Sequence, residues 1–201
     1  MRVGAKRSGP EDELEFDMKD TAFAVPDSAI DRLAAEYGPE QGGGLKVIDP
    51  PETSKYRSMP ASLSGGGGLV STARDYARFC QMLLGEGTLF DTRLLKPKTV
   101  SLMMSNHIPD DGLPIVLRGI PRVGWGFGLG FAIRVGSGQS AAEAEEVDAP
   151  LEECRWGGSS STHFWLLPKE DLGVIVLQQY RPFMRVLETK IKPIVYEAIE
   201  E

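Results

Sequence analysis

In this 201-residue sequence, the histidines and the serines near them are the first candidates for nucleophilic catalysis. Its two histidines are His107, which follows a predicted helix end, and His163, which lies in a predicted strand. A serine nucleophile needs a base beside it and donors for the developing oxyanion. Ser160 and His163 are candidates for a triad, but residues so close in one strand lack the convergent geometry that a triad requires. We therefore expect structural or surface roles for both histidines.

Other catalytic patterns are missing from the sequence. No serine has glycine two residues away on both sides, so there is no Gly-x-Ser-x-Gly nucleophile elbow. Glycines 65–68 precede a predicted helix without the Lys-Ser/Thr pair of a phosphate loop, and we interpret them as a packing turn. Cys80 and Cys154 are too few for a disulfide framework and, with two histidines, for a metal site. We expect no metal and no cofactor.

The amino-acid composition and net charge exclude further classes of function. A hydrophobic fraction of 41% and a charged fraction of 25% are typical of globular proteins. The net charge of -7 argues against a nucleic-acid partner, and no apolar run approaches the roughly 20 residues of a membrane span. The acidic stretch over residues 143–153 is predicted to be a solvated loop. Residues 1–16 show no signal peptide, which leaves the compartment open and favours the cytoplasm.

The first half of the chain is predicted to be largely helix and loop. Residues 1–16 are a polar extension, residues 26–37 a short helix ended by glycines 42–44, and residues 46–64 an extended loop. Thr72 and Asp75 can cap a helix that ends at Gly85 and Gly87. Its apolar stripe consists of Tyr76, Phe79, Cys80 and Leu83. A second helix with Pro97 in its first turn buries Val100, Met103 and Met104.

The second half is predicted to be mainly strands followed by a helix. Residues 126–135 form one strand, in which alternating glycines allow a neighbouring backbone to approach. Residues 154–158 and 162–167 form one bent strand or two, and residues 173–177 a strand apolar on both faces. Residues 181–201 form a covering helix, in which Pro193 could cause a kink. Its inner side is predicted to carry Phe183, Leu187, Ile191, Ile194, Val195 and Ala198. This order predicts an α+β fold with an antiparallel sheet.

Five blocks, in order and at the right spacing, resemble the class C β-lactamase, penicillin-binding-protein-like and family VIII carboxylesterase group. The blocks are Met18–Phe23, Gly66–Asp75, Leu95–Val100, Gly126–Phe131 and Trp156–Gly158 followed by Thr162–Trp165. The first block departs from the family pattern, because Glu15-Phe16-Asp17 replaces the usual Pro-Leu-Gly. The resemblance covers residues 17–201 and implies the C-terminal part of a β-lactamase/transpeptidase-like domain.

The resemblance also implies an active site. Members of the group hydrolyse an ester or amide through an acyl-enzyme, using a Ser-x-x-Lys nucleophile and a tyrosine motif. Both motifs should precede Met18, and no Ser-x-x-Lys occurs in the sequence, so we expect a truncated chain that is inactive alone. The resemblance makes Trp156, Gly157 and Gly158 the strand beside a small-molecule substrate and the Ser159 N–H the second oxyanion donor. Trp156 in place of the family's lysine implies a carboxylesterase-like pocket.

Three alternatives stay open. Gly157 and Gly158 could simply mark a bend in a strand, and the chain could be a non-catalytic binding module that keeps part of the fold. An independent hydrolase that uses Ser160 or His163 is the third reading. In each case a sheet without its N-terminal partners would expose an apolar surface, and we expect the chain to self-associate.

Overall fold

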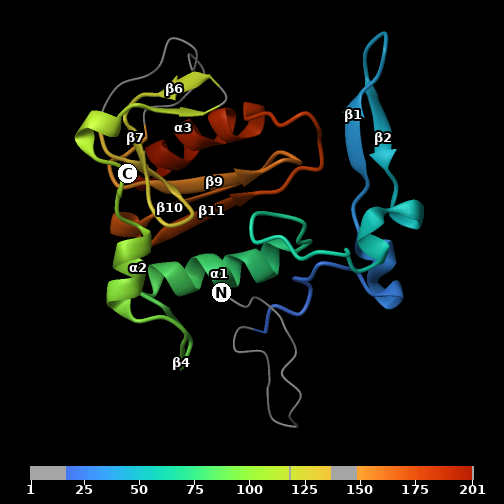
Figure 1. Cartoon of the computed structure of the whole chain (residues 1–201), viewed down its shortest axis with the longest axis horizontal. Helices are drawn as coiled ribbons and strands as arrows, with labels where there is room; N and C mark the ends of the chain where they lie inside the picture. Colours follow the sequence, from blue (N-terminus) through green and yellow to red (C-terminus); the bar gives the residue numbers. More distant parts are fainter. Residues whose placement is uncertain (1–16, 118, 137–148, 201) are drawn as a thin grey trace. The chain divides into compact units, whose positions relative to one another are not determined.

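The structure is a computed structural model that describes residues 17–117, 119–136 and 149–200. The chain divides into two compact units, coloured along the sequence in Figure 1. The first unit contains the described residues up to Phe79 and two short segments, Gly158–Thr162 and Leu177–Met184. The second contains most of the rest, including the large sheet. The predicted extension over residues 1–16 lies outside the described residues.

A β-hairpin is the main strand element of the first unit. β1 (Glu36–Pro39) pairs antiparallel with β2 (Leu45–Asp49). Glycines 42–44 in the turn between them all have positive φ, a conformation that glycine adopts without strain. Tyr37 and Val47 face each other across the hairpin, and aromatic and β-branched residues favour strands once a turn pairs them. The glycines therefore connect two strands and do not end a helix.

The prediction for residues 26–64 is accordingly wrong in two places. The helical part is a 3-10 helix limited to Asp27–Arg32, and Glu36 already belongs to β1. The region expected to be an extended loop contains β2 and two further 3-10 turns, at Pro51–Thr53 and Lys55–Arg57.

The helix predicted after Thr72 is confirmed as α1 (Ala73–Leu84). The Thr72 hydroxyl accepts a hydrogen bond from the Asp75 N–H at 3.2 Å, as expected of a cap. The Asp75 carboxylate accepts bonds from the Asp20 N–H at 2.8 Å and the Thr21 hydroxyl at 3.0 Å. The start of α1 is thus tied to the first of the family-like blocks.

The second unit is built on a five-stranded sheet in the order β11-β10-β9-β8-β7. The strands are β7 (Trp125–Phe127), β8 (Ala132–Arg134), β9 (Cys154–Gly158), β10 (Thr162–Leu167) and β11 (Leu172–Val176). Neighbours in the sheet are consecutive in sequence, and the β7–β8, β8–β9 and β10–β11 pairs are antiparallel. Residues 154–158 and 162–167 are therefore two strands.

The single strand predicted over residues 126–135 is wrong, because the chain turns back between β7 and β8. Gly130, in this turn, has a φ of 106°. A Cβ atom at Gly128 would lie 2.2 Å from the Met103 carbonyl oxygen, and one at Gly126 would lie 2.1 Å from the Asn106 side chain. The prediction that these glycines let a neighbouring backbone approach is confirmed at Gly128 only, because Gly126 meets a side chain and Gly130 has no atom within 4 Å of a new Cβ.

Helices cover both faces of the sheet (Figure 1). On one face, a side chain at Gly173 would meet Leu166 of β10 and Cys80 and Leu84 at the end of α1. On the other, α3 (Val186–Glu200) packs over Trp125, Trp165 and Leu167, to which Ile191, Val195 and Tyr196 contribute. The predicted α+β arrangement with a covering C-terminal helix is confirmed.

The predicted inner face of α3 is only partly right. Ile191 and Val195 pack on the core, but Ile194 is 66% exposed and Leu187 is also exposed. The most deeply buried positions are instead Glu188 and Lys192, one helical turn apart. These charged residues displace the apolar stripe because they meet charged partners on the sheet.

The remaining elements are short. α2 (Pro97–Met103) begins at the predicted proline and buries Val100. Two hairpins flank it in sequence, and their strands are β3 (Thr88–Leu89) with β4 (Thr92–Arg93) and β5 (Ile115–Leu117) with β6 (Ile120–Arg122). Further 3-10 turns lie at Asp110–Gly112 and Pro168–Glu170. Among the helices of the described residues, none has the length and apolar character needed to cross a membrane.

Candidate functional site

The four residues predicted to face substrate lie at the end of β9 and the start of the following turn. Trp156 is 43% exposed, Gly157 and Gly158 are half-buried, and Ser159 is exposed. Cys154 and Arg155, which begin the same strand, are buried. The strand therefore runs from the core to the surface, and its accessible end is the predicted site.

Trp156 gives this strand end an aromatic surface without charge. Its indole packs edge-on against the ring of Phe127 in β7, with ring centroids 5.1 Å apart and planes at 86°. This geometry is a favourable aromatic pairing and fixes the orientation of the ring. An acyl or alkyl group could pack against it, whereas a lysine at the same position would present an ammonium group.

Gly158 is explained at least in part by packing. A Cβ atom there would lie 2.4 Å from the hydroxyl oxygen of Thr162, so any larger residue would displace Thr162. The absence of a side chain at Gly158 is thus no evidence for a ligand by itself. The case for a substrate beside Trp156–Gly158 depends instead on the accessible position of these residues at the end of β9 and on the N–H of Ser159, which follows them.

The turn Gly158–Ser161 presents that amide. The Ser161 N–H donates to the Gly158 carbonyl at 3.0 Å, which closes a β-turn, and neither Ser159 nor Ser160 has a positive φ, as is also true of a type I turn. Ser161, with a φ of 63°, is buried and its hydroxyl donates to the Tyr180 carbonyl at 2.9 Å. Among the described residues, no acceptor binds the Ser159 N–H. A fixed turn with an unused N–H is what an oxyanion donor requires.

The candidate triad of Ser160 and His163 does not form. The Ser160 hydroxyl donates to the carboxylate of Glu36, and His163 is buried with its Nδ1 3.0 Å from Glu188. His107 is exposed, and its ring contacts the Leu102 carbonyl at 2.7 Å. Both histidines thus have the structural or surface surroundings expected of them.

A buried charged cluster between α3 and the sheet was not foreseen. Lys192 lies 2.5 Å from Glu153 and 3.2 Å from Glu188. Glu188 also bonds Arg185, at 2.9 and 3.0 Å, and lies 3.6 Å from Arg155. Glu153 had been expected in a solvated loop, and this is wrong because its side chain is fully buried against Lys192 and Tyr196. Elsewhere in that acidic stretch Glu152 is exposed, as expected, and residues 143–148 lie outside the described residues.

The cluster is held in its charged form by mutual compensation. Burial opposes ionisation of Glu188, but hydrogen bonds from His163 and Arg185 and the charge of Lys192 outweigh it and hold its pKa well below 4.5. Burial lowers the pKa of Lys192, against the opposing effect of Glu153. Burial and the Glu153 carboxylate raise the pKa of Tyr196. The spacing of Glu188, Lys192 and Tyr196, every fourth residue, was the only sequence signal for this cluster.

The charged cluster is buried between α3 and the sheet, and this burial distinguishes it from a reaction centre. Arg155, next to Trp156 in sequence, stacks 3.5 Å above the ring of Trp125, and its side chain is nearly buried. Glu153, Glu188 and Lys192 are each at most 3% exposed. Buried charges of this kind stabilise one arrangement of strand and helix, and they are closed to substrate.

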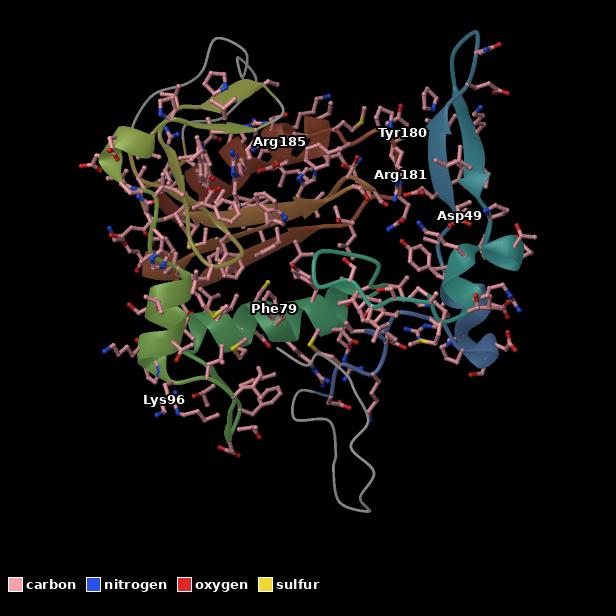
Figure 2. The ribbon with its side chains drawn as sticks, viewed as in Figure 1. Asp49, Phe79, Lys96, Tyr180, Arg181 and Arg185 are labelled. Atoms are coloured by element: carbon pink, nitrogen blue, oxygen red, sulfur yellow. The ribbon has the colours of Figure 1, made fainter. Side chains whose placement is uncertain are left out.

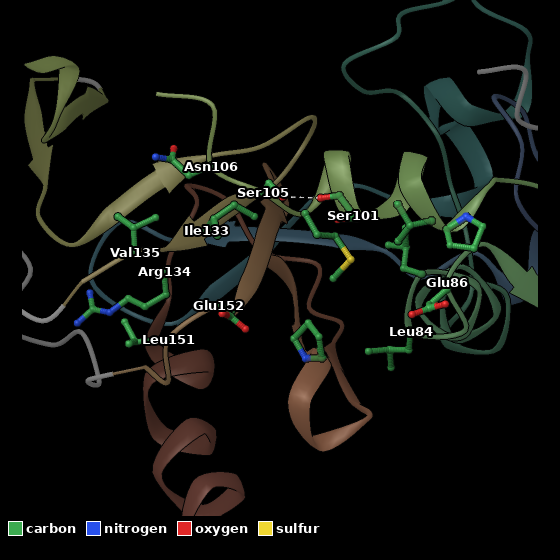
Figure 3. A pocket seen from close by; sticks show the side chains of 15 residues that line it. Leu84, Glu86, Ser101, Ser105, Asn106, Ile133, Arg134, Val135, Leu151 and Glu152 are labelled. Atoms are coloured by element: carbon green, nitrogen blue, oxygen red, sulfur yellow. Dashed lines mark hydrogen bonds between the residues drawn. The ribbon is translucent and has the colours of Figure 1, made fainter. Parts of the chain in front are cut away.

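A cleft of about 630 Å³ also lies in the second unit (Figure 3). Its walls combine apolar side chains, among them Val100, Ile133 and Leu151, with polar and charged ones. Ser101 and Ser105 lie on it, and the Ser105 hydroxyl donates to the Ser101 carbonyl at 2.6 Å. No histidine or lysine of the described residues lines the cleft, and the carboxylates that do line it, Glu86 and Glu152, make no hydrogen bond to either serine. None of the predicted site residues belongs to it.

Metal and thiol chemistry find no support in the described residues. No three of their His, Cys, Asp or Glu side chains gather as a metal site would require. Cys80 and Cys154 are buried and unpaired, and burial raises the pKa of each thiol to about 12. Both thiols are therefore protonated at neutral pH, as expected of structural cysteines.

Comparison with known proteins agrees with this fold. The chain is 34% identical over 174 residues to Protein Rv1367c of Mycobacterium tuberculosis, which covers 84% of this chain and 41% of that protein. It shares its fold with a simvastatin synthase mutant from Aspergillus terreus (TM-score 0.71, 20% identity, 93% of this chain and 49% of that one). A second solved structure is EstCE1, a hydrolase with promiscuous acyltransferase activity (TM-score 0.62, 24% identity, 90% and 47%).

The chain spans less than half the length of each of these relatives. The family model described as Beta-lactamase matches residues 11–192, nearly the whole sequence. The chain therefore belongs to the beta-lactamase family, the serine β-lactamase and penicillin-binding-protein-like group that its motifs resemble.

Proposed function

We propose that residues 17–201 are the C-terminal part of a serine hydrolase domain that cleaves carboxylic esters through an acyl-enzyme. Residues 1–16 would precede this domain as a polar extension. In this proposal Trp156, Gly157 and Gly158 line the substrate, and the Ser159 N–H donates to the oxyanion. The substrate is a small-molecule ester, or an amide as the next choice.

The observation that carries the proposal is the exposed end of β9, with the free amide of Ser159 following directly after it. In the chemistry proposed, a serine hydroxyl attacks the substrate carbonyl and its oxygen becomes negative. The Ser159 N–H stabilises that oxygen. The alcohol then leaves with a proton, and water attacks the acyl-serine to release the acid and regenerate the hydroxyl.

The surroundings of Trp156 support an ester substrate. Its exposed indole, packed edge-on against Phe127, offers an apolar contact where the resemblance would place a lysine. A substrate carboxylate, such as that of a penicillin, would find no ammonium at this position. A neutral acyl group fits better, because it gains from apolar burial.

In this proposal the attacking serine and its proton carriers come from polypeptide outside these 201 residues, which hold no Ser-x-x-Lys. We therefore propose that the chain by itself does not hydrolyse esters. The second candidate is a non-catalytic binding module, and the packing of Gly158 against Thr162 favours it, because that glycine is explained without a substrate.

A pair of substitutions at Ser159 tests the proposed donor. The test uses the polypeptide obtained when the reading frame is followed upstream of Met1, here called the extended polypeptide. Ser159 is the second residue of this β-turn and has no positive φ, and proline is common at that position of type I turns, so we use Ser159→Pro to remove the N–H. Ser159→Ala keeps the N–H and serves as the matched control.

We expect Ser159→Pro to lower kcat for p-nitrophenyl butyrate by about 100- to 1000-fold, the loss typical of one oxyanion donor. Ser159→Ala should lose at most about tenfold, since it forfeits only the contact between its hydroxyl and Arg181. Equal kcat values for the two variants would exclude the Ser159 amide. An extended polypeptide without esterase activity would favour the non-catalytic module.

A further inference from the structure

A carboxylate and a guanidinium lie directly behind the turn that presents the Ser159 amide. Arg181 Nε donates to Glu36 of β1 at 2.8 Å, and Arg181 Nη2 donates to the Ser159 hydroxyl at 3.0 Å. The same oxygen of Glu36 accepts a hydrogen bond from the Ser160 hydroxyl. One ion pair thus holds the side chains of two successive turn residues. Figure 2 labels Arg181 and its neighbour Tyr180.

Backbone hydrogen bonds hold this ion pair in place. The Tyr37 N–H donates to the Gln179 carbonyl at 2.9 Å, and the Arg181 N–H donates to the Tyr37 carbonyl at 2.8 Å. The Tyr180 N–H donates to the Ser160 carbonyl at 3.0 Å. β1, the segment around Arg181 and the serine turn are therefore joined within the first unit, although they are far apart in sequence.

The pair is charged and partly shielded from water. The Glu36 side chain is 14% exposed and that of Arg181 is 38% exposed. Burial acts to raise the pKa of Glu36, but hydrogen bonds from Ser160 and Arg181 outweigh it, so the pKa lies below 4.5. Bonds between charged groups are shorter and stronger than neutral ones, which makes this a stiff support.

We propose that Glu36 and Arg181 are positioning residues, which fix the Ser159 N–H so that it points at the developing oxyanion. The inference rests on the proposed function and adds to it a support from β1, 123 residues before the turn. A donor of this kind must be held to within about 0.5 Å, because its benefit depends on preorganisation. Ser159 alone, at an exposed turn, has no other side-chain anchor among the described residues.

The first test compares Glu36→Gln with Glu40→Gln in the extended polypeptide. Glutamine keeps an oxygen for Ser160 but removes the charge that holds Arg181. Glu40 is exposed in the turn of the same hairpin and touches neither serine, so it is the control. We expect Glu36→Gln to lower kcat for p-nitrophenyl butyrate about tenfold with KM within about twofold, because the interaction matters only in the transition state. Glu40→Gln should match the unmodified polypeptide.

A double-mutant cycle separates positioning from general stabilisation. In the Ser159→Pro background there is no amide left to position, so adding Glu36→Gln should change kcat by less than about twofold. A merely structural role would produce the same loss in both backgrounds. Reacting sites are counted with a fluorophosphonate, so that kcat refers to folded protein only. Arg181→Lys, which keeps the charge but not the fork, is the second variant should Glu36→Gln fold poorly.

The outcomes are distinguishable. An active extended polypeptide whose kcat is unchanged by both Glu36→Gln and Arg181→Lys overturns the positioning role and leaves the proposed function intact. Equal losses in the two Ser159 backgrounds also overturn it. An extended polypeptide with no esterase activity and no fluorophosphonate adduct overturns the proposed function, and the positioning role with it.

Discussion

Ser161 occupies a backbone conformation that usually belongs to glycine, and two hydrogen bonds explain why a serine is tolerated. Its φ is 63°, a region that costs a non-glycine residue about 1 kcal/mol. In return its hydroxyl donates to the Tyr180 carbonyl at 2.9 Å and accepts from the Met184 N–H at 3.0 Å. The side chain thus links the serine turn to the segment after β11.

Two substitutions of Ser161 separate the cost of its backbone strain from the contribution of its hydrogen bonds. Ser161→Ala keeps the strain and leaves two buried backbone groups unpaired, which should cost about 2–4 kcal/mol in the free energy of unfolding. Ser161→Gly loses the same bonds but relieves the strain, so its loss should be smaller by about 1 kcal/mol. Urea unfolding of the three proteins measures this. An alanine variant as stable as the glycine variant would contradict the account.

Glu188 makes stability depend on acid pH. Its folded-state pKa lies below the ordinary value of 4.5, so the unfolded state binds its proton first as the pH falls. The contribution to stability is therefore complete above about pH 5 and is lost as the pH falls from 4.5 through the folded-state pKa. The groups that face this carboxylate are Arg155, His163, Arg185 and Lys192.

The variant Glu188→Gln should be less stable than the parent chain at pH 7 and should lose less stability on acidification. Urea unfolding between pH 7 and the acid limit of folding gives both curves, and their difference isolates Glu188 from the other carboxylates. Parallel curves would show that the ionisation of Glu188 contributes nothing.

Among the elements, the hairpin of β7 and β8 depends on Gly128, which lets the end of α2 approach. The Leu129 N–H donates to the Met103 carbonyl at 2.9 Å, and a Cβ atom at Gly128 would lie 2.2 Å from that same oxygen. The contact therefore ties the end of α2 to the start of the β7–β8 turn.

Gly128→Ala should destabilise the chain by about 1–3 kcal/mol, because backbone atoms and not a flexible side chain must move. Gly136→Ala is the control: it has no atom within 4 Å of a new Cβ and no positive φ, so it should change stability by no more than about 0.5 kcal/mol. The measurement is the melting temperature of each of the two variants. Equal melting temperatures would refute the close approach.

Elements with local signals could be predicted, and elements that depend on distant partners could not. Pro97, Thr72 and the glycines after Leu84 mark α1 and α2 in the sequence itself. The hairpin of β1 and β2 has no comparable signal, because a run of glycines such as 42–44 is as typical of a helix end as of a turn between strands. The inner face of α3 was misjudged because Glu188 and Lys192 meet Glu153 and His163, 25 to 39 residues earlier.

The candidate site divides in the same way. Trp156–Ser159 could be identified because the resemblance and the glycine pair are local, and the structure places Trp156 and Ser159 at the surface. Glu36 and Arg181 carry no motif, and only the fold brings them to Ser159 and Ser160. Charged residues that act through a turn are recognisable only once their partners are placed.

For the whole chain, the order of the sheet supports the expectation of self-association. In the described residues β11 ends the sheet and pairs only with β10, and Leu177, which directly follows β11, is 47% exposed. An apolar strand at a sheet edge is a template for pairing with another chain. Relatives of about twice this length share the fold.

We expect the 201-residue chain to self-associate at micromolar concentrations, with a weight-average mass in sedimentation that rises with concentration. Leu177→Lys adds a charge at the strand end, a device that natural edge strands use, and should reduce the association. A monomer at every concentration, with a sharp cooperative melt, would contradict this expectation.

In our proposal these residues supply a substrate-lining strand and an amide for a negative oxygen, while the attacking hydroxyl lies outside residues 1–201. Intact-mass measurement after treatment with a fluorophosphonate distinguishes this arrangement from a chain that carries its own nucleophile. The 201-residue chain should gain no adduct, and the extended polypeptide should gain one, on a serine outside residues 1–201. A stable adduct on a serine within the chain, such as Ser160, would contradict the account.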